Sequence, residues 1–129
     1  MRFLWLCLAL LLGACGPAPK FNGTDLKGVD WGKELTLAGH DGKSHSLAEF
    51  KGRTVVLFFG YTQCPDVCPV TMGSLRELMA TLGTDAQRVQ VLFVTVDPER
   101  DTPQLLAQYV PAFHPTFLGL YGDSAATAK

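Results

Sequence analysis

The sequence lacks an excess of charge of either sign. Lysine and arginine together number 11 and aspartate and glutamate 12, which gives the 129-residue chain a net charge of −1. A protein that binds the phosphate backbone of nucleic acid needs a basic surface, so this composition argues against nucleic acid as a partner. Charged residues make up only 18% and hydrophobic residues 47%, a balance that predicts one globular domain and excludes extended disorder.

Apolar stretches long enough to cross a membrane are also missing. Residues 3–12 are almost wholly apolar, but that run is too short to span a bilayer. A positive start at residues 1–2, the apolar run and the small residues 13–14 have the layout of a secretory signal. Cys15 follows directly, and the segment resembles a bacterial lipobox. The resemblance implies a lipoprotein signal peptide over residues 1–14.

By the same resemblance, Cys15 is diacylated and becomes the mature N-terminus. Two acyl chains anchor a protein durably, so we expect a protein of the cell envelope, anchored to a membrane and facing the extracytoplasmic side (the periplasm). The alternative is a soluble secreted protein cleaved near residue 14. Residues 15–33 are rich in proline, glycine and polar residues and lack an apolar period, which predicts a tether before a domain at residues 34–129.

Cysteine is scarce, with four in the chain. Cys7 leaves with the signal and Cys15 carries the lipid, so Cys64 and Cys68 are the pair that remains in the domain. An extracytoplasmic compartment is oxidising. Two nearby thiols there are kept reduced by a partner, bind a metal, or form a disulfide.

Hydrophobic patterning predicts an α/β fold. Residues 34–38 and 44–47 flank Asp41 and Gly42, which predicts a β-hairpin, and residues 47–50 fit one helical turn. A strand buried on both faces is expected from the continuous apolar run at residues 54–59.

The rest of the pattern predicts parallel strands joined by helices. A helix over residues 69–82 and a buried strand over residues 89–96 complete a βαβ unit. Thr102 is a candidate cap for a second helix that ends at Pro111, and residues 116–121 predict a third strand. An apolar third strand this near the last residue predicts an unpaired sheet edge. We therefore expect a C-terminally truncated chain that lacks further strands and a helix.

The cysteines lie between the first parallel strand and its helix, where open α/β sheets bind ligands. Cys68 is expected at the helix N-terminus, where the dipole and free amides favour a thiolate. Two sulfurs at the spacing of Cys64 and Cys68 can hold one soft ion, Cu(I) above all, or close a disulfide. Two inert buried cysteines are the third possibility.

Two long motifs carry a family resemblance. Residues 59–69 read FGYTQCPDVCP and residues 93–103 read FVTVDPERDTP, and both resemble signatures of the SCO/SenC family. FLGL at residues 117–120 resembles the segment that follows, so the likeness covers about residues 35–121. It implies a thioredoxin-like fold with an N-terminal hairpin and three α/β/α layers. It also implies a copper chaperone for assembly of cytochrome c oxidase.

By that resemblance, Cys64 and Cys68 bind Cu(I) and form a disulfide when oxidised. The expected partners are subunit II of the oxidase, whose CuA centre receives the copper, together with a copper donor and a thiol reductant. In a complete chain a histidine well downstream is a third ligand and supports Cu(II), but this sequence ends at Lys129 before that position. His40, His45 and His114 are not assigned as substitutes.

Other residues near the predicted site have two interpretations each. Asp97 is a candidate hydrogen-bond acceptor or proton carrier behind the cysteines, or it shapes the turn with Pro98. Residues 99–101 form a solvated charged loop or a partner-recognition segment. Phe59 is expected in the core, and Tyr61 either packs in the core or shields the metal.

Three alternatives to the chaperone remain open. The first is an extracytoplasmic thiol–disulfide oxidoreductase that reduces the cysteines of a copper-site protein, although redox motifs commonly separate their cysteines by two residues and this pair by three. The second is a peroxidase of the peroxiredoxin kind, disfavoured because residues 60–72 contain no lysine or arginine to activate a thiol. The third is a non-functional fragment. A metallochaperone is favoured over an enzyme.

Overall fold

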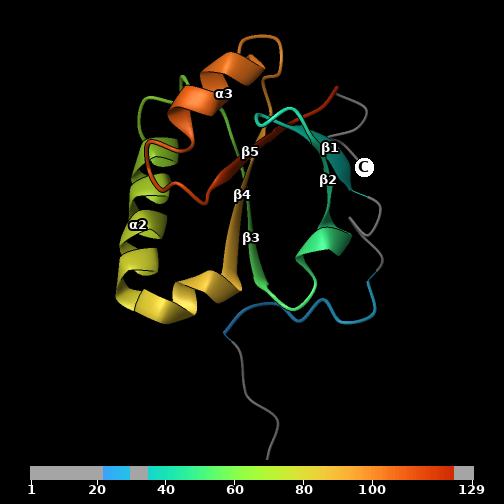
Figure 1. Cartoon of the computed structure of the whole chain (residues 1–129), viewed down its shortest axis with the longest axis vertical. Helices are drawn as coiled ribbons and strands as arrows, with labels where there is room; N and C mark the ends of the chain where they lie inside the picture. The colour runs from blue at the N-terminus through green and yellow to red at the C-terminus, as the bar shows by residue number, and fades with distance from the viewer. Residues whose placement is uncertain (1–21, 30–34, 124–129) are drawn as a thin grey trace, which may run out of the picture.

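A computed structural model describes residues 22–29 and 35–123, and its core is a five-stranded mixed sheet in the order β2-β1-β5-β4-β3 (Figure 1). The signal segment and Cys15 lie outside the described residues. None of the helices in the described ranges has the length and apolar character needed to cross a membrane. The elements are, in chain order, β1 (Thr36–Gly39), β2 (Ser44–Ser46), the 3-10 turn η2 (Leu47–Phe50), β3 (Thr54–Gly60), α2 (Val67–Leu82), the 3-10 turn η3 (Gly83–Arg88), β4 (Val89–Thr95), α3 (Pro103–Tyr109) and β5 (Leu118–Tyr121).

The sheet joins a parallel half to an antiparallel hairpin. Strands β3, β4 and β5 run parallel, and β1 pairs antiparallel with both β5 and β2. The predicted hairpin and βαβ unit are thus confirmed. The predicted unpaired edge at the third strand is wrong, because β1 folds back along β5. His40 closes this seam: its backbone N–H donates to the Gly119 carbonyl at 2.9 Å, and the Gly119 N–H donates to its Nδ1 at 2.9 Å.

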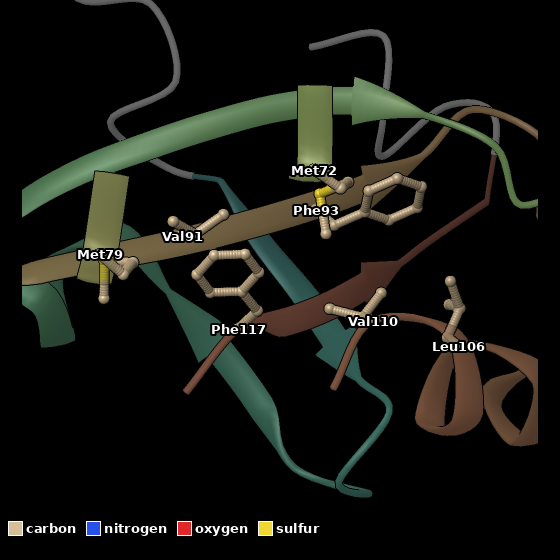
Figure 2. Close-up of a cluster of buried hydrophobic side chains, with 7 residues drawn as sticks. All are labelled: Met72, Met79, Val91, Phe93, Leu106, Val110 and Phe117. Carbon is tan, nitrogen blue, oxygen red and sulfur yellow. The ribbon is translucent and has the colours of Figure 1, made fainter. Parts of the chain in front are cut away.

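Both α-helices pack against the same face of the sheet. The two sequential right-handed crossovers place them there, since β3, β4 and β5 lie side by side in chain order. Figure 2 shows the side chains that fill this space, with Met72 of α2 beside the ring of Phe93 on β4 and Met79 near Val91. The buried members are Met72, Met79, Val91, Phe93, Leu106, Val110 and Phe117.

A second apolar cluster occupies the opposite face. Its buried residues are Leu37, Phe50, Leu92, Val94 and Leu120. Within the described ranges this face is covered by η2 and residues near the hairpin, while α2 and α3 lie on the other side (Figure 1). The mixed α/β class is confirmed, and of the three expected layers the described residues supply the sheet and one full helical layer.

The prediction that β3 is buried on both faces is wrong. Strand β3 is the edge of the sheet beside β4. Val56 and Phe58 contact the helix-side cluster, but Leu57 and Phe59 point to the other face, where they are 37% and 48% exposed. Phe59 is therefore not a core residue. The central strand β4 does have the expected burial, with every residue from Gln90 onward buried.

The helix boundaries follow the predicted capping signals closely. Helix α2 begins at Val67, two residues before the predicted start, so Cys68 lies in its first turn. Helix α3 begins at Pro103, and the Thr102 hydroxyl accepts the Leu105 N–H at 3.3 Å, as the sequence predicted. These two helix starts and the carboxyl ends of β3 and β4 frame the candidate site.

Candidate metal-binding and thiol site

The two cysteines lie together between the end of β3 and the first turn of α2. The loop leaves β3 at Gly60, and the Cys64 N–H donates to the Tyr61 carbonyl at 3.3 Å. The Cys68 N–H then donates to the Cys64 sulfur at 3.4 Å. Both cysteines are free thiols, with Cys64 9% and Cys68 3% exposed. The structure thus brings together the pair that the sequence singled out.

Cys64 takes the place of a helix cap. Asp66 occupies the N-cap position of α2 but makes no side-chain capping bond. The hydrogen bond from the Asp66 backbone amide lowers the pKa of the Cys64 thiol, and bonds from the Cys68 thiol, the Cys68 amide and the Tyr61 hydroxyl add to this effect. The unpaired amides of the helix start therefore favour the thiolate of Cys64.

Cys68 has the opposite electrostatic character. Burial raises the pKa of its thiol, and the neighbouring Cys64 sulfur raises it further against a bond from the Tyr61 backbone. The sequence placed Cys68 correctly at the helix N-terminus but assigned the thiolate to the wrong cysteine. The reason is geometric: the free amides of the first turn point toward the sulfur of the preceding loop, not toward a side chain on the helix itself.

Two residues of the β3 end pack directly on the sulfurs. The Tyr61 hydroxyl hydrogen-bonds to Cys64, and the negative charge of the Cys64 thiolate raises the pKa of this tyrosine. Tyr61 thus lies against the cysteine pair and is not a member of either apolar cluster, and its role as a shield of a bound metal stays a prediction. Gly60 approaches the other sulfur so closely that a Cβ built on it would lie 3.1 Å from Cys68 Sγ.

Asp97 has contacts typical of a turn-shaping residue. Its carboxylate pairs with Arg100 at 2.5 Å, its N–H donates to Thr95 Oγ1 at 3.0 Å, and its carbonyl accepts the amide of Asp101 at 2.9 Å. These bonds hold the loop between β4 and α3. They support the turn interpretation, and the role of Asp97 behind the cysteines stays a prediction.

The residue that sequence reasoning missed is Asp101. The sequence predicts a charged segment that is either solvated or used for partner recognition, but Asp101 is 1% exposed. Its Oδ2 accepts hydrogen bonds from the Thr62 N–H at 2.9 Å and the Thr95 hydroxyl at 2.6 Å, and its Oδ1 accepts one from the Thr62 hydroxyl at 2.6 Å. The available signal was its position: it follows a parallel strand and directly precedes the Thr102 cap of the next helix.

The three histidines each have a local partner. His40 accepts the Gly119 N–H, His45 lies between two carboxylates of the hairpin region, and the His114 ring contacts the Thr116 hydroxyl at 2.9 Å. The part of the chain that the structure describes contains no group of three or more histidine, cysteine or acidic side chains placed to hold a metal. The donor set at the site is therefore the two sulfurs, which suits a soft ion of low coordination number.

Comparisons with known proteins agree on one family. The family model described as SCO1/SenC matches residues 24–129. Among curated proteins, the mitochondrial SCO2 homologue of Bos taurus is 42% identical over 98 residues, which cover 74% of this chain and 37% of the bovine protein.

Solved structures support the same assignment. ScoI of Bradyrhizobium japonicum with copper bound superposes with a TM-score of 0.70 at 41% identity, covering 75% of this chain and 62% of that one. BsSco, described as a member of the Sco family of cytochrome c oxidase assembly proteins with a disulfide switch, gives a TM-score of 0.60 at 28% identity over 76% of this chain and 60% of its own. This chain thus spans less than two thirds of each of these relatives. The chain belongs to the SCO1/SenC family, and its fold is the thioredoxin-like fold of the Sco structures.

Proposed function

We propose that this protein is a copper chaperone that binds copper through Cys64 and Cys68 and serves assembly of the CuA centre of cytochrome c oxidase. One observation carries the proposal: the two thiols meet at the carboxyl end of β3, with 3.4 Å between the Cys68 nitrogen and the Cys64 sulfur, in a chain related to a copper-bound ScoI. Copper is here the cargo of the protein, taken from a donor and passed on.

The chemistry of the pair suits Cu(I). Binding replaces the two thiol protons by one cation held between two thiolates, and Cu(I) accepts such a low coordination number. Cys64 is already biased toward its thiolate by the amides of the helix start. The buried Cys68 gives up its proton only when a cation compensates the buried charge, so metal capture and proton release are coupled there. A histidine supplied as a third donor would extend the site to Cu(II).

The proposed setting is the cell envelope. A diacyl anchor at Cys15 would hold the domain at a membrane on the extracytoplasmic side, with residues 16–33 as the tether. The proposed acceptor is subunit II of the oxidase, and a copper donor and a thiol reductant act upstream. Metabolic labelling with a fatty acid tests the anchor: a chain that incorporates label and loses it on Cys15→Ser supports it, and labelling retained in that variant contradicts it.

An anaerobic Cu(I) titration against a chromophoric chelator tests the metal site. The full chain carrying Cys7→Ser and Cys15→Ser leaves Cys64 and Cys68 as the two thiols. We expect one equivalent bound by this parent and none bound tightly after Cys64→Ser or Cys68→Ser. Full binding in either of these variants contradicts the assignment. As a matched control, Ser46→Cys is added to either variant, which restores the number of thiols on β2, at the opposite edge of the sheet from β3. We expect this added thiol not to rescue binding.

A second function, reduction of disulfides in a copper-site protein, is favoured by the inequality of the two thiols. Cys64 has the lowered pKa and the greater exposure, as an attacking thiol requires, while Cys68 is buried behind it as a resolving thiol. The Cys64 thiolate attacks the substrate disulfide, and Cys68 then displaces the substrate from the mixed disulfide. The substrate gains two electrons and the pair becomes Cys64–Cys68, which an external thiol reductant must reopen.

The two functions separate in one assay. Reduced chain is mixed with an oxidised CuA-type subunit II domain, with and without bound Cu(I), and the free thiols of the domain are counted. Reduction of the domain by copper-free chain supports the reductase. Appearance of copper in a domain that was reduced beforehand, with no change in its thiol count, supports the chaperone.

A further inference from the structure

We propose that Asp101 is the positioning residue of the cysteine loop, holding the segment that carries Cys64 in register with Cys68. This deepens the proposed function, because it assigns a determinant of the pair on which that function rests. The side-chain hydrogen bonds of Asp101 reach Thr62 and Thr95, and Asp101 acts on the sulfurs through Thr62. The inference rests on geometry: a carboxylate that is 1% exposed accepts three hydrogen bonds from two separate segments.

The carboxylate joins three parts of the fold. Its bonds to the Thr62 N–H and hydroxyl reach the loop that follows β3, and its bond to Thr95 reaches the end of β4. Its own backbone lies directly before Thr102, the cap of α3. One buried side chain thus ties the cysteine loop to the two neighbouring elements at the carboxyl edge of the sheet.

The path from Asp101 to Cys64 is short. Thr62 is fixed at both its amide and its hydroxyl, so the adjacent Tyr61 is fixed as well. The Tyr61 carbonyl accepts the Cys64 N–H at 3.3 Å, and its hydroxyl contacts the Cys64 sulfur. Cys68 is placed separately by α2. Asp101 therefore controls where one sulfur stands relative to the other.

Loss of the carboxylate frees the loop. Asp101→Ala leaves the Thr62 amide and the Thr95 hydroxyl without their buried acceptor, so the loop opens to water to satisfy them. The two sulfurs then meet for a smaller fraction of the time. Because preorganisation contributes directly to binding, both Cu(I) capture and disulfide closure weaken. Loss of a residue that orients a metal ligand lowers affinity about 10- to 100-fold, and we expect the lower end here.

Asp101→Asn distinguishes positioning from charge. With its oxygen at the Oδ2 position, the amide still accepts from the Thr62 N–H and the Thr95 hydroxyl. Its NH₂ group then donates to the Thr62 hydroxyl, which accepts as readily as it donates. A positioning role predicts that Asn rescues the site and Ala does not.

Gln90→Ala is the matched control for a general loss of stability. Gln90 lies on β4, is 7% exposed, and makes three hydrogen bonds, from Arg53 and to the carbonyls of Val91 and Thr116. It stands at the opposite end of the strand from the cysteine loop. Its removal costs buried hydrogen bonds of the same number without touching Thr62.

The experiment measures two equilibria on the full chain carrying Cys7→Ser and Cys15→Ser. One is Cu(I) affinity against a chromophoric chelator. The other is the equilibrium of the pair with glutathione, in which two protein thiols are oxidised to Cys64–Cys68 while glutathione disulfide is reduced to two thiols. We expect Asp101→Ala to lower both constants about tenfold, and Asp101→Asn and Gln90→Ala to stay within about threefold of the parent.

Three outcomes overturn the proposal: Asp101→Ala indistinguishable from Gln90→Ala in both constants, Asp101→Asn as impaired as Asp101→Ala, or additive effects of Asp101→Ala and Thr62→Ala in a double-mutant cycle. If Asp101→Ala does not fold, Thr62→Ala against Thr62→Ser asks the same question with one hydroxyl bond. Impairment by Ala with rescue by Ser then supports the proposal, and equal behaviour of the two overturns it. A parent chain that binds no Cu(I) contradicts the proposed function alone, since the glutathione equilibrium still tests Asp101.

Discussion

Replacing Gly60 with alanine should destabilise the domain and disturb the cysteine pair together. Gly60 is the last residue of β3, and a Cβ built there would lie 3.0 Å from ring carbons of Phe58 and Phe93 and 3.1 Å from Cys68 Sγ. Gly60 is not among the glycines with positive φ, so alanine suits the backbone and the whole effect comes from crowding. Phe93 is fully buried and its ring packs against the rings of Phe58 and Tyr109, so the Phe93 ring cannot move away from an added methyl group.

The expected cost is that of overpacking a filled core, about 1–3 kcal/mol. Domains of this size are stable by only about 5–15 kcal/mol. With a urea m-value of roughly 2 kcal/mol per molar, a loss of 2 kcal/mol moves the unfolding midpoint down by about 1 M. The added methyl group can be accommodated by a shift of the Cys68 sulfur, and because such a shift disturbs the cysteine pair, Cu(I) affinity should fall as well.

Gly73→Ala is the matched control. Gly73 lies in the middle of α2, and a Cβ there would meet nothing within 4 Å. Removing glycine from a helix interior stabilises by about 0.5–1 kcal/mol. The assay is urea unfolding of the reduced chains followed by far-ultraviolet circular dichroism. A Gly60→Ala chain that unfolds at the parent midpoint, while Gly73→Ala rises as expected, would refute the close packing of β3 on Cys68.

Three further predictions follow from the same structure. In single-cysteine variants, Cys64 should be alkylated by iodoacetamide at lower pH and faster than Cys68, because the pKa of the first is lowered by helix amides and that of the second is raised by burial; equal rates would contradict this. Thr102→Ala should cost about 1 kcal/mol of unfolding free energy by loss of the α3 cap, and Thr102→Ser should restore it. Burial lowers the pKa of His45, but hydrogen bonds to Glu49 and Asp41 outweigh it and raise the pKa above its ordinary value, while the same bonds lower the pKa of both acids. The contribution of the raised histidine pKa to folding stability is complete below about pH 6.5 and is lost as pH rises. The contribution of the two lowered acid pKa values is complete above about pH 4.5 and is lost as pH falls. The difference in melting temperature between the parent and His45→Gln should therefore be widest between those two pH values.

Local patterns were enough to predict the elements, but not which sheet faces are covered. Capping and periodicity predicted the first residue of α3 correctly and the first residue of α2 to within two residues, because those signals act over one turn of the helix. The same apolar run that marked β3 as a strand could not show that β3 is the sheet edge, since strand order depends on contacts far apart in sequence. For that reason Phe59 was wrongly predicted to be a core residue, although it is 48% exposed. The partner of β5 was missed likewise, because β1 lies about 80 residues earlier in the chain.

The candidate site divides in the same way. The spacing of Cys64 and Cys68 was visible in the sequence, and so was their place at a helix start. Asp101 was not, because its burial comes from Thr62 and Thr95, which lie on two other segments. A charged residue within a mixed-charge run is solvated unless distant donors enclose it. Only the assembled sheet edge supplies those donors.

The inequality of the two thiols serves both proposed activities without a change of structure. Loop and helix position the pair differently: Cys64 is held by hydrogen bonds to the helix amides and to Tyr61, and Cys68 is held by its place in the first turn of α2. Under the proposed function, Cys64 is therefore the thiol that loses its proton more readily when a copper ion or a disulfide arrives. Cys68 holds its proton more firmly, because burial raises the pKa of its thiol. In the proposed activities Cys64 would thus engage before Cys68, so Cu(I) transfer and disulfide exchange would share one order of events. The nature of the incoming group would then decide which of them takes place.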